Sequence, residues 1–177
     1  GTRAVPFARE LWIERDDFQE QPPKGYFRLS PGAEVRLRYG YVIRCVGVDR
    51  DAGGAVTAVH CTYDPSTRSG TPGAEARKIK GNIHWLSVRH AERAEVRLYD
   101  RLFAVPQPGS ADSLTAELNP NSIRVTHGFV EPSAGQLPPE TRVQFERHGY
   151  FVTDRVDHTV AKPVFNRVTT LKDSWGK

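Results

Sequence analysis

The sequence contains no methionine and only two cysteines, Cys45 and Cys61. Because even the first residue is not methionine, we expect the chain to be a piece of a longer protein. Two cysteines are too few for a disulfide framework, and no C-x-x-C pair is present to hold zinc. His60 precedes Cys61, but neighbouring residues of a strand point to opposite faces and could not share a metal ion. We therefore expect both cysteines to be small core residues of a cytoplasmic protein.

Long apolar runs and enzyme motifs are also missing. No run approaches the roughly 18 apolar residues that cross a bilayer, which excludes a membrane-spanning protein. The motifs G-x-x-x-x-G-K-[ST], G-x-G-x-x-G, G-x-S-x-G and H-E-x-x-H do not occur. His84 and His90 have no nucleophile within their own segments, and a lone histidine is more often a satisfied polar residue than a catalyst. These absences predict a binding module without catalytic residues or metal ligands of its own.

The charged residues that are present are dominated by arginine. Of the 25 basic residues 19 are arginine and six are lysine, and the 21 acidic residues leave a formal net charge of +4. That charge is too small for a chain of 177 residues to be disordered. Arginine carries a planar fork of donors that suits phosphates and base edges. The length allows one large domain or two small ones.

Period-two alternation of apolar and polar residues dominates the chain. The clearest unit is a β-hairpin of residues 41–48 and 56–63, joined by the turn Asp-Ala-Gly-Gly at 51–54. Thirteen prolines and 15 glycines separate short strands, which favours barrels or sandwiches over helical bundles. We therefore predict an all-β protein made of two small antiparallel β-barrels packed together. Further strands are expected at 10–14, 34–39, 82–86, 95–99, 123–130, 142–147 and 164–169.

One or two short helices are expected among the strands. The first spans roughly residues 110–118, with Ser110 as its cap and Asn119-Pro120 as its stop. The second is a single turn at 87–93. The stretch 65–76 is rich in Ser, Thr, Gly and Pro, which predicts an exposed loop.

Basic residues lie beside aromatic residues on the predicted strands. Arg36 and Arg38 are two apart, so both leave one face of a strand while Val35 and Leu37 pack inward. By the same rule Arg28 shares a face with Tyr26, and Phe27 and Leu29 point the other way. Arg77, Lys78 and Lys80 form a further basic run. Such a surface suits unstacked RNA bases, although a solvated barrel exterior would have the same pattern.

Eight longer runs, which cover nearly the whole chain, are far more specific than any short motif. They are V-P-F-A-R-E-L-W-I-E-R-D-D-F (5–18), F-R-L-S-P-G-A-E-V-R-L-R (27–38), H-C-T-Y-D-P (60–65), R-K-I-K-G-N-I-H-W-L-S (77–87), E-V-R-L-Y-D-R-L-F (95–103), N-P-N-S-I-R-V-T-H-G-F-V-E-P (119–132), V-Q-F-E-R-H-G-Y-F (143–151) and P-V-F-N-R-V-T-T-L-K-D-S-W (163–175). In this order they resemble the C-terminal anticodon-binding region of the glutaminyl-tRNA synthetase family.

The resemblance implies two barrels similar to ribosomal protein L25. Residues 1–85 would form the first barrel, completed by residues 160–177, and residues 86–159 the second. It implies a class I ligase that joins glutamine to tRNA(Gln) with ATP and magnesium in a catalytic domain outside this chain. The segment itself would be non-catalytic and without a cofactor. Its partners would be the tRNA(Gln) anticodon loop and the enzyme's own N-terminal catalytic domain, in a monomeric cytoplasmic enzyme.

The resemblance also assigns residues to the anticodon. Arg28 matches the arginine that reads the third base, and Arg36 and Arg38 match those at the first base and its backbone. Gln144 and Arg147 match the pair that binds the middle uracil. Residues three apart lie on opposite faces of a strand, so these two converge only if the strand ends or bulges within 146–149.

Two positions of the chain differ from the family pattern, and two other protein classes remain as alternatives to this assignment. Family members carry Gln and Lys where this chain has Gly25 and Phe27, so RNA contacts by those two side chains are not implied. An archaeal or eukaryotic-type glutamyl-tRNA synthetase has related barrels, although the runs at 97–103 and 144–151 favour glutamine. A free-standing ribosomal RNA-binding protein with the same barrel is the alternative from another class.

Overall fold

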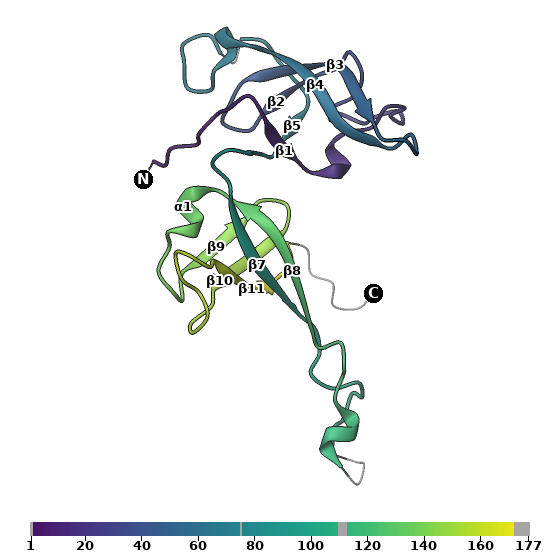
Figure 1. Ribbon diagram of the computed structural model, residues 1–177, viewed down its shortest axis with the longest axis vertical. Helices are drawn as coiled ribbons and strands as arrows, with labels where there is room; N and C mark the ends of the chain where they lie inside the picture. The colour runs from purple at the N-terminus through teal and green to yellow at the C-terminus, as the bar shows by residue number, and fades with distance from the viewer. Residues whose placement is uncertain (1, 75, 110–112, 172–177) are drawn as a thin grey trace. The chain divides into compact units, whose positions relative to one another are not determined.

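The computed structural model describes residues 2–74, 76–109 and 113–171 and divides the chain into two compact units (Figure 1). The N-terminal unit is Val5–Arg89. The C-terminal unit combines Gly1–Ala4 with His90–Lys177. The predicted boundary at residue 85 falls inside a strand of the N-terminal unit that pairs with residues 11–13, so the boundary lies a few residues later.

The N-terminal unit is built on a four-stranded sheet with the order β4-β3-β2-β5. Its β2–β3 and β3–β4 pairs are antiparallel, and β5 runs parallel to β2. A separate two-stranded sheet pairs β1 with β6. The strands are β1 (Leu11–Ile13), β2 (Glu34–Leu37), β3 (Val42–Arg50), β4 (Val56–Asp64), β5 (Asn82–Ile83) and β6 (Trp85–Ser87), with short 3-10 helices η1 (Arg15–Asp17) and η2 (Pro65–Thr67).

The β3–β4 hairpin confirms the clearest sequence prediction. Asp51 begins the turn because its Oδ1 accepts hydrogen bonds from the backbone N–H groups of Gly53 and Ala55, both at 2.9 Å. Gly54 has φ +84°, a conformation that favours glycine. The register shifts between Cys45 and Gly47, so one extra residue bulges out of β3.

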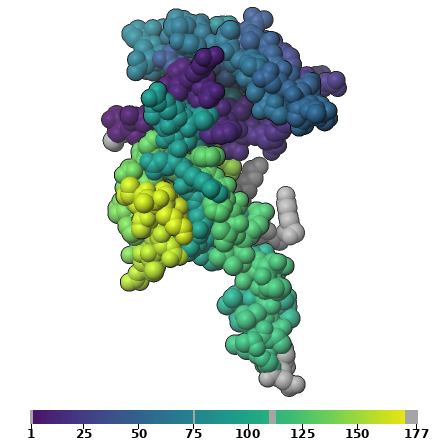
Figure 2. All heavy atoms as spheres, viewed as in Figure 1, coloured from purple at the N-terminus to yellow at the C-terminus, as the bar shows by residue number. Residues whose placement is uncertain are grey.

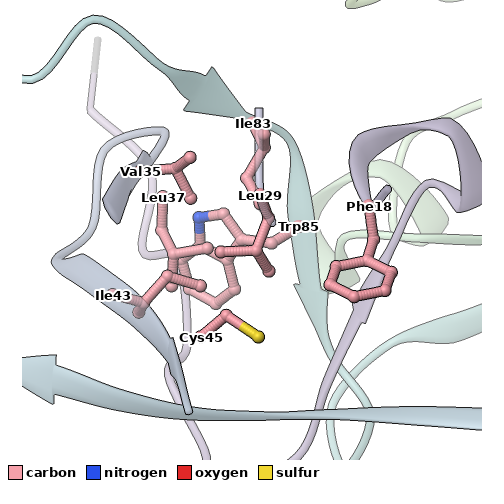
Figure 3. Close-up of a cluster of buried hydrophobic side chains, with 8 residues drawn as sticks. All are labelled: Phe18, Leu29, Val35, Leu37, Ile43, Cys45, Ile83 and Trp85. Carbon is pink, nitrogen blue, oxygen red and sulfur yellow. The ribbon is translucent and has the colours of Figure 1, made fainter. Parts of the chain in front are cut away.

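The core of the N-terminal unit lies against β2 (Figure 3). Val35 and Leu37 are fully buried, which confirms the predicted alternation along this strand. Leu29, Ile83 and Trp85 pack into the same cluster from outside the β2–β3 hairpin. Burial of these apolar side chains, at about 25 cal/mol per Å² removed from water, holds the short strands together.

The C-terminal unit contains a five-stranded sheet with the order β8-β7-β11-β10-β9. All its pairs are antiparallel except β7–β11, which is parallel. Ala94, Val130, Phe151 and Phe165 form the buried core. The strands are β7 (Glu92–Tyr99), β8 (Ile123–Val130), β9 (Arg142–Phe145), β10 (Gly149–Thr153) and β11 (Val164–Thr169), with a short helix α1 (Pro132–Gly135).

Strand β11 corrects the predicted domain division. Residues 160–177 were expected to complete the first barrel, but β11 is hydrogen-bonded between β7 and β10 of the C-terminal unit. Phe165 and Val164 have no exposed surface there, so moving the strand elsewhere would empty the core of this unit. Residues 172–177 lie outside the described part.

The helix predictions were only partly right. The segment predicted as helix 110–118 contains a 3-10 helix, η3 (Leu114–Glu117), and residues 110–112 lie outside the described residues. The turn predicted at 87–93 is instead the end of β6, a tight turn and the start of β7. Strand β10 was not predicted as a separate element.

The all-β prediction is confirmed, but none of the three described sheets closes into a barrel. Within the C-terminal unit β7 and β8 carry residues 100–109 and 113–122 away from the five-stranded sheet (Figures 1 and 2). This projecting segment exposes Leu102, Leu114 and Leu118. Among the described residues no helix has the length and apolar character needed to cross a membrane.

Candidate nucleic-acid interface

Strand β2 carries Arg36 on the face opposite the core, and Arg38 lies in the turn that follows the strand. Arg38 is exposed, and its guanidinium carbon lies 5.2 Å from the centroid of the Tyr39 ring. Trp85 Nε1 donates to the Arg38 carbonyl at 2.8 Å, which anchors this end of the strand to the core. Tyr39 has φ +60° and is 54% exposed at the tip of the β2–β3 turn. The turn therefore presents a cation beside an accessible ring, an arrangement that can stack on a base.

Arg36 is more constrained than its strand position predicted. Its Nη1 donates to the Thr67 carbonyl and its Nη2 to the Ala74 carbonyl, both at 2.8 Å. Thr67 is itself held, because its Oγ1 accepts from the Val42 backbone N–H at 2.8 Å. The loop predicted as exposed at 65–76 thus folds back over β2, and Thr67 and Ala74 are buried. Arg36 holds this loop in place with two of its five N–H donors.

Arg28 lies in an irregular segment outside the named strands, where an isolated bridge pairs Leu29 with Phe18. Its Nη1 donates to the Asp16 carbonyl at 3.1 Å, and the Tyr26 hydroxyl donates to the same carbonyl at 3.0 Å. Arg28 and Tyr26 therefore share a side, as predicted. Leu29 is buried, but Phe27 is 55% exposed. The prediction that Phe27 points inward was wrong because the segment is not a regular strand.

A second aromatic–cation pair lies next to Arg28. The Lys80 Nζ lies 5.2 Å from the centroid of the Phe27 ring. Gly81 lies between strand β2 and the segment that carries Phe27 and Arg28. The Gly81 carbonyl accepts a hydrogen bond from the Arg36 N–H at 2.9 Å. A β-carbon on Gly81 would lie 2.2 Å from the Phe27 carbonyl oxygen. The segment carrying Arg28 and the strand carrying Arg36 thus both contact Gly81.

Sequence reasoning missed Phe27 and Tyr39 as possible base-stacking groups. The available signal was an aromatic residue directly beside an arginine, at 27–28 and again at 38–39. Their exposure could not be predicted, because it depends on an irregular segment and on a turn with positive φ.

In the C-terminal unit Gln144 and Arg147 lie on the β9–β10 hairpin. Gln144 is exposed and pairs across the strands with Tyr150, which is 46% exposed. Strand β9 ends at Phe145, whose carbonyl accepts from the His148 N–H at 3.0 Å across the turn. Arg147 sits in that turn with φ +70° and is exposed. Strand β9 therefore ends between Gln144 and Arg147, which is the condition that the sequence analysis set for these two side chains to converge.

Several other arginines are occupied by carboxylates. Arg97 is only 17% exposed and contacts Glu95 at 2.7 Å, Asp154 at 3.2 Å and Asp157 at 2.6 Å. These contacts raise the pKa of Arg97, with the Asp157 hydrogen bond as the largest cause. Arg77 pairs with Glu34 and Asp64. Arg97, with little exposed surface and three carboxylate partners, stabilises the fold and is a poor candidate for an RNA surface.

The resemblance implies ATP and magnesium in a catalytic domain outside this chain. Among the described residues, no cluster of three or more His, Cys, Asp or Glu side chains could hold a metal ion. The carboxylates of Glu95, Asp154 and Asp157 all pair with the guanidinium of Arg97.

Comparison with known proteins decides the family. Two family models, both described as the anticodon-binding domain of class I tRNA synthetases (E and Q), match residues 1–64 and 82–154. The chain belongs to the anticodon-binding domain family of the class I glutamyl- and glutaminyl-tRNA synthetases. The two models coincide with most of the N-terminal unit and with most of the C-terminal unit of this synthetase domain pair.

Individual relatives of this synthetase region all match over the whole chain. Proteins named glutamine–tRNA ligase are 62% identical in Ralstonia pickettii, 63% identical in Cupriavidus metallidurans and 52% identical in Nitrosomonas europaea. The matches cover 100% of this chain and 31%, 31% and 32% of those proteins. The chain thus spans about a third of the length of the curated relatives it matches.

Proposed function

We propose that this chain is the anticodon-binding region of a glutamine–tRNA ligase of the cytoplasm. It binds the anticodon loop of tRNA(Gln), while a catalytic domain outside this chain activates glutamine with ATP and magnesium. The observation that carries the proposal is 62–63% identity over the entire chain to proteins named glutamine–tRNA ligase.

In this proposal the N-terminal unit reads the outer bases of the anticodon. Arg28 binds the third base, and Arg36 and Arg38 bind the first base and its phosphate. Arg28 and Arg36 are each held by backbone carbonyls, so little side-chain entropy remains to be lost on binding. Arg38 is exposed at a turn and can reach a phosphate without disturbing the core.

The C-terminal unit binds the middle uracil through Gln144 and Arg147. A glutamine amide offers a donor and an acceptor together, which matches the N3–H and carbonyl groups of uracil. Arg147, at the exposed turn, adds a charge-assisted bond to a uracil carbonyl or to the neighbouring phosphate. Tyr150, opposite Gln144, places a ring beside the amide on the same side of the hairpin.

The test compares the full-length enzyme on two tRNAs that differ only at the middle anticodon base. Gln144→Ala should reduce the preference for uracil over cytosine in kcat/KM by about tenfold or more. Gln107→Ala, at another exposed glutamine, should keep the wild-type preference. An unchanged preference in Gln144→Ala would exclude Gln144 as the reader of the middle base. Glutamylation in place of glutaminylation by the full enzyme would overturn the assignment of the amino acid.

A second measurement tests whether this chain binds tRNA while the catalytic residues lie outside it. The isolated chain should bind tRNA(Gln) with an affinity that falls steeply with salt, because phosphate contacts release counterions. It should show no glutamine-dependent pyrophosphate exchange. Affinity that does not change between dilute and moderate salt would argue against an RNA surface on this chain.

A further inference from the structure

Cys45 and Cys61 are directly opposite each other in the β3–β4 hairpin. Cys45 is buried in the core of the N-terminal unit, as expected. Cys61 is exposed on strand β4, so the expectation that both cysteines are core residues was wrong for Cys61. The two residues are 16 positions apart, and the hairpin register alone brings them together.

The backbone hydrogen bonds of Cys45 show whether Cys45 and Cys61 form a hydrogen-bonded or a non-hydrogen-bonded pair of the antiparallel strands. Its N–H donates to the Ala33 carbonyl at 3.2 Å, and its carbonyl accepts from the Gly32 N–H at 3.0 Å. Both groups point toward the β2 side, because the N–H and C=O of one residue leave a strand in the same direction. Neither therefore bonds to β4, and Cys45 and Cys61 form a non-hydrogen-bonded pair.

Non-hydrogen-bonded antiparallel pairs bring side chains closest together. Their Cα atoms lie about 4.5 Å apart, within the roughly 4.4–6.8 Å that a disulfide accepts. The neighbouring pairs Arg44–Thr62 and Ile43–Tyr63 are in regular register, and on the other side the register shifts between Cys45 and Gly47. The backbone spacing of such a pair therefore allows a disulfide.

We propose that Cys45 and Cys61 are a covalent modification site, a cross-strand dithiol that closes to an intramolecular disulfide under a two-electron oxidant. With a small-molecule disulfide as the oxidant, the Cys61 thiolate attacks one of its sulfurs. The attack forms a mixed disulfide and releases one thiolate. The Cys45 thiolate then attacks the Cys61 sulfur and releases the second. Two protein thiols lose two electrons and two protons, and the oxidant becomes two thiols.

The thiol of Cys61 keeps its proton at neutral pH. Partial burial of the Cys61 side chain, together with the neighbouring Cys45, raises the pKa of Cys61 to about 12. A thiol in such surroundings reacts slowly, so closure needs an excess of oxidant. This behaviour suits a site that stays reduced until oxidant accumulates.

Closure would tie down an edge strand. Among the described residues β4 pairs only with β3, and it runs directly into the loop whose carbonyls hold Arg36. The bond would enclose residues 46–60, and cross-linking a loop of this kind restricts the unfolded chain. The oxidised protein should therefore unfold at a higher temperature than the reduced protein.

The experiment treats the full-length protein with excess diamide, blocks remaining thiols with iodoacetamide under denaturing conditions and digests with trypsin. Cleavage after Arg44, Arg50 and Arg68 places Cys45 in fragment 45–50 and Cys61 in fragment 51–68. Mass spectrometry should find these fragments linked, two hydrogens lighter than their sum, and separated by dithiothreitol. Recovery of both as alkylated fragments, while a control dithiol peptide is fully oxidised, would overturn the proposal.

A stability measurement gives an independent readout. Oxidation should raise the thermal midpoint of the N-terminal unit by several degrees in the wild type and leave it unchanged in Cys61→Ser, where the exposed position tolerates the change. Cys45→Ala supplies a second variant without the cross-link. A midpoint shift of equal size in wild type and Cys61→Ser would mean that oxidation acts elsewhere, and the proposal would fail.

Discussion

The Nε of Arg28 lies 3.3 Å from Oδ1 of Asp17, a carboxylate with no exposed side-chain surface. Arg28 itself is 41% exposed, so one edge of its guanidinium contacts a buried anion while the rest remains accessible. The Asp16 carbonyl accepts a second bond from the same group. The Asp17 carboxylate and the Asp16 carbonyl therefore fix the orientation of Arg28, the arginine that we propose to read the third base.

The first prediction concerns this pair. Arg28→Ala should lower the free energy of unfolding by about 1–3 kcal/mol, because it removes a charged partner from the buried Asp17. Arg9→Ala, at an exposed arginine, should change it by less than about 0.5 kcal/mol. Urea unfolding of both variants measures the difference. Equal effects would show that Asp17 does not need Arg28.

Arg36 and Arg38 should differ from each other in the same urea unfolding assay. Arg36→Ala should cost about 2–3 kcal/mol, because the buried Thr67 and Ala74 carbonyls lose charge-assisted bonds. Arg38→Ala should stay within about 0.5 kcal/mol, since its side chain lies at the exposed turn. Matching losses would mean that Arg36 does not hold the 65–74 loop in solution.

Gly81→Ala should destabilise the N-terminal unit without touching any charged residue. The new β-carbon would lie 2.2 Å from the Phe27 carbonyl oxygen and 2.8 Å from Val35 Cγ1, so backbone must move. Overpacking of this kind costs roughly 1–3 kcal/mol. Gly47→Ala is the control, because its nearest neighbour atoms are 4.0 Å away. Thermal unfolding compares the two, and an equal midpoint in both variants would contradict the close approach.

Arg147→Gly separates the side chain of the hairpin turn from its backbone. Glycine adopts φ +70° without the strain of an L side chain, so the unfolding free energy should stay within about 1 kcal/mol of wild type. Affinity for tRNA(Gln) should nevertheless fall, and its dependence on salt should become shallower. Filter binding at two salt concentrations measures both effects. Unchanged affinity would remove Arg147 from the proposed surface.

The last prediction concerns acid. The Asp157 backbone N–H is the largest cause that lowers the pKa of Asp154, from 3.8 to about 2, followed by the Asn166 amide. Its folded-state pKa lies below the unfolded value, so its stabilisation is complete above about pH 4 and is lost as the pH falls toward 2. Asp154→Asn should therefore show a smaller loss of stability between pH 5 and about pH 2 than wild type in urea titrations. Parallel losses in both proteins would contradict this account.

Local patterns in the sequence were sufficient for the elements whose contacts are local. The hairpin of β3 and β4 follows from two alternating runs around Asp51-Ala-Gly-Gly, and the burial of Val35 and Leu37 follows from the pleat of one strand. Such features depend on residues within a few positions of one another. They therefore do not depend on how distant parts of the chain pack.

The features that only the tertiary structure shows are contacts between residues distant in sequence. No local pattern could assign β11 to the gap between β7 and β10, because any half-buried strand could fill it. The carbonyls that hold Arg36 come from a loop more than 30 residues away, and their positions depend on how that loop closes. The contact of Cys45 with Cys61 depends on hairpin register, which a one-residue shift would abolish. The sequence by itself determined the fold class and the family, whereas long-range pairing decided which arginines are held and which remain accessible.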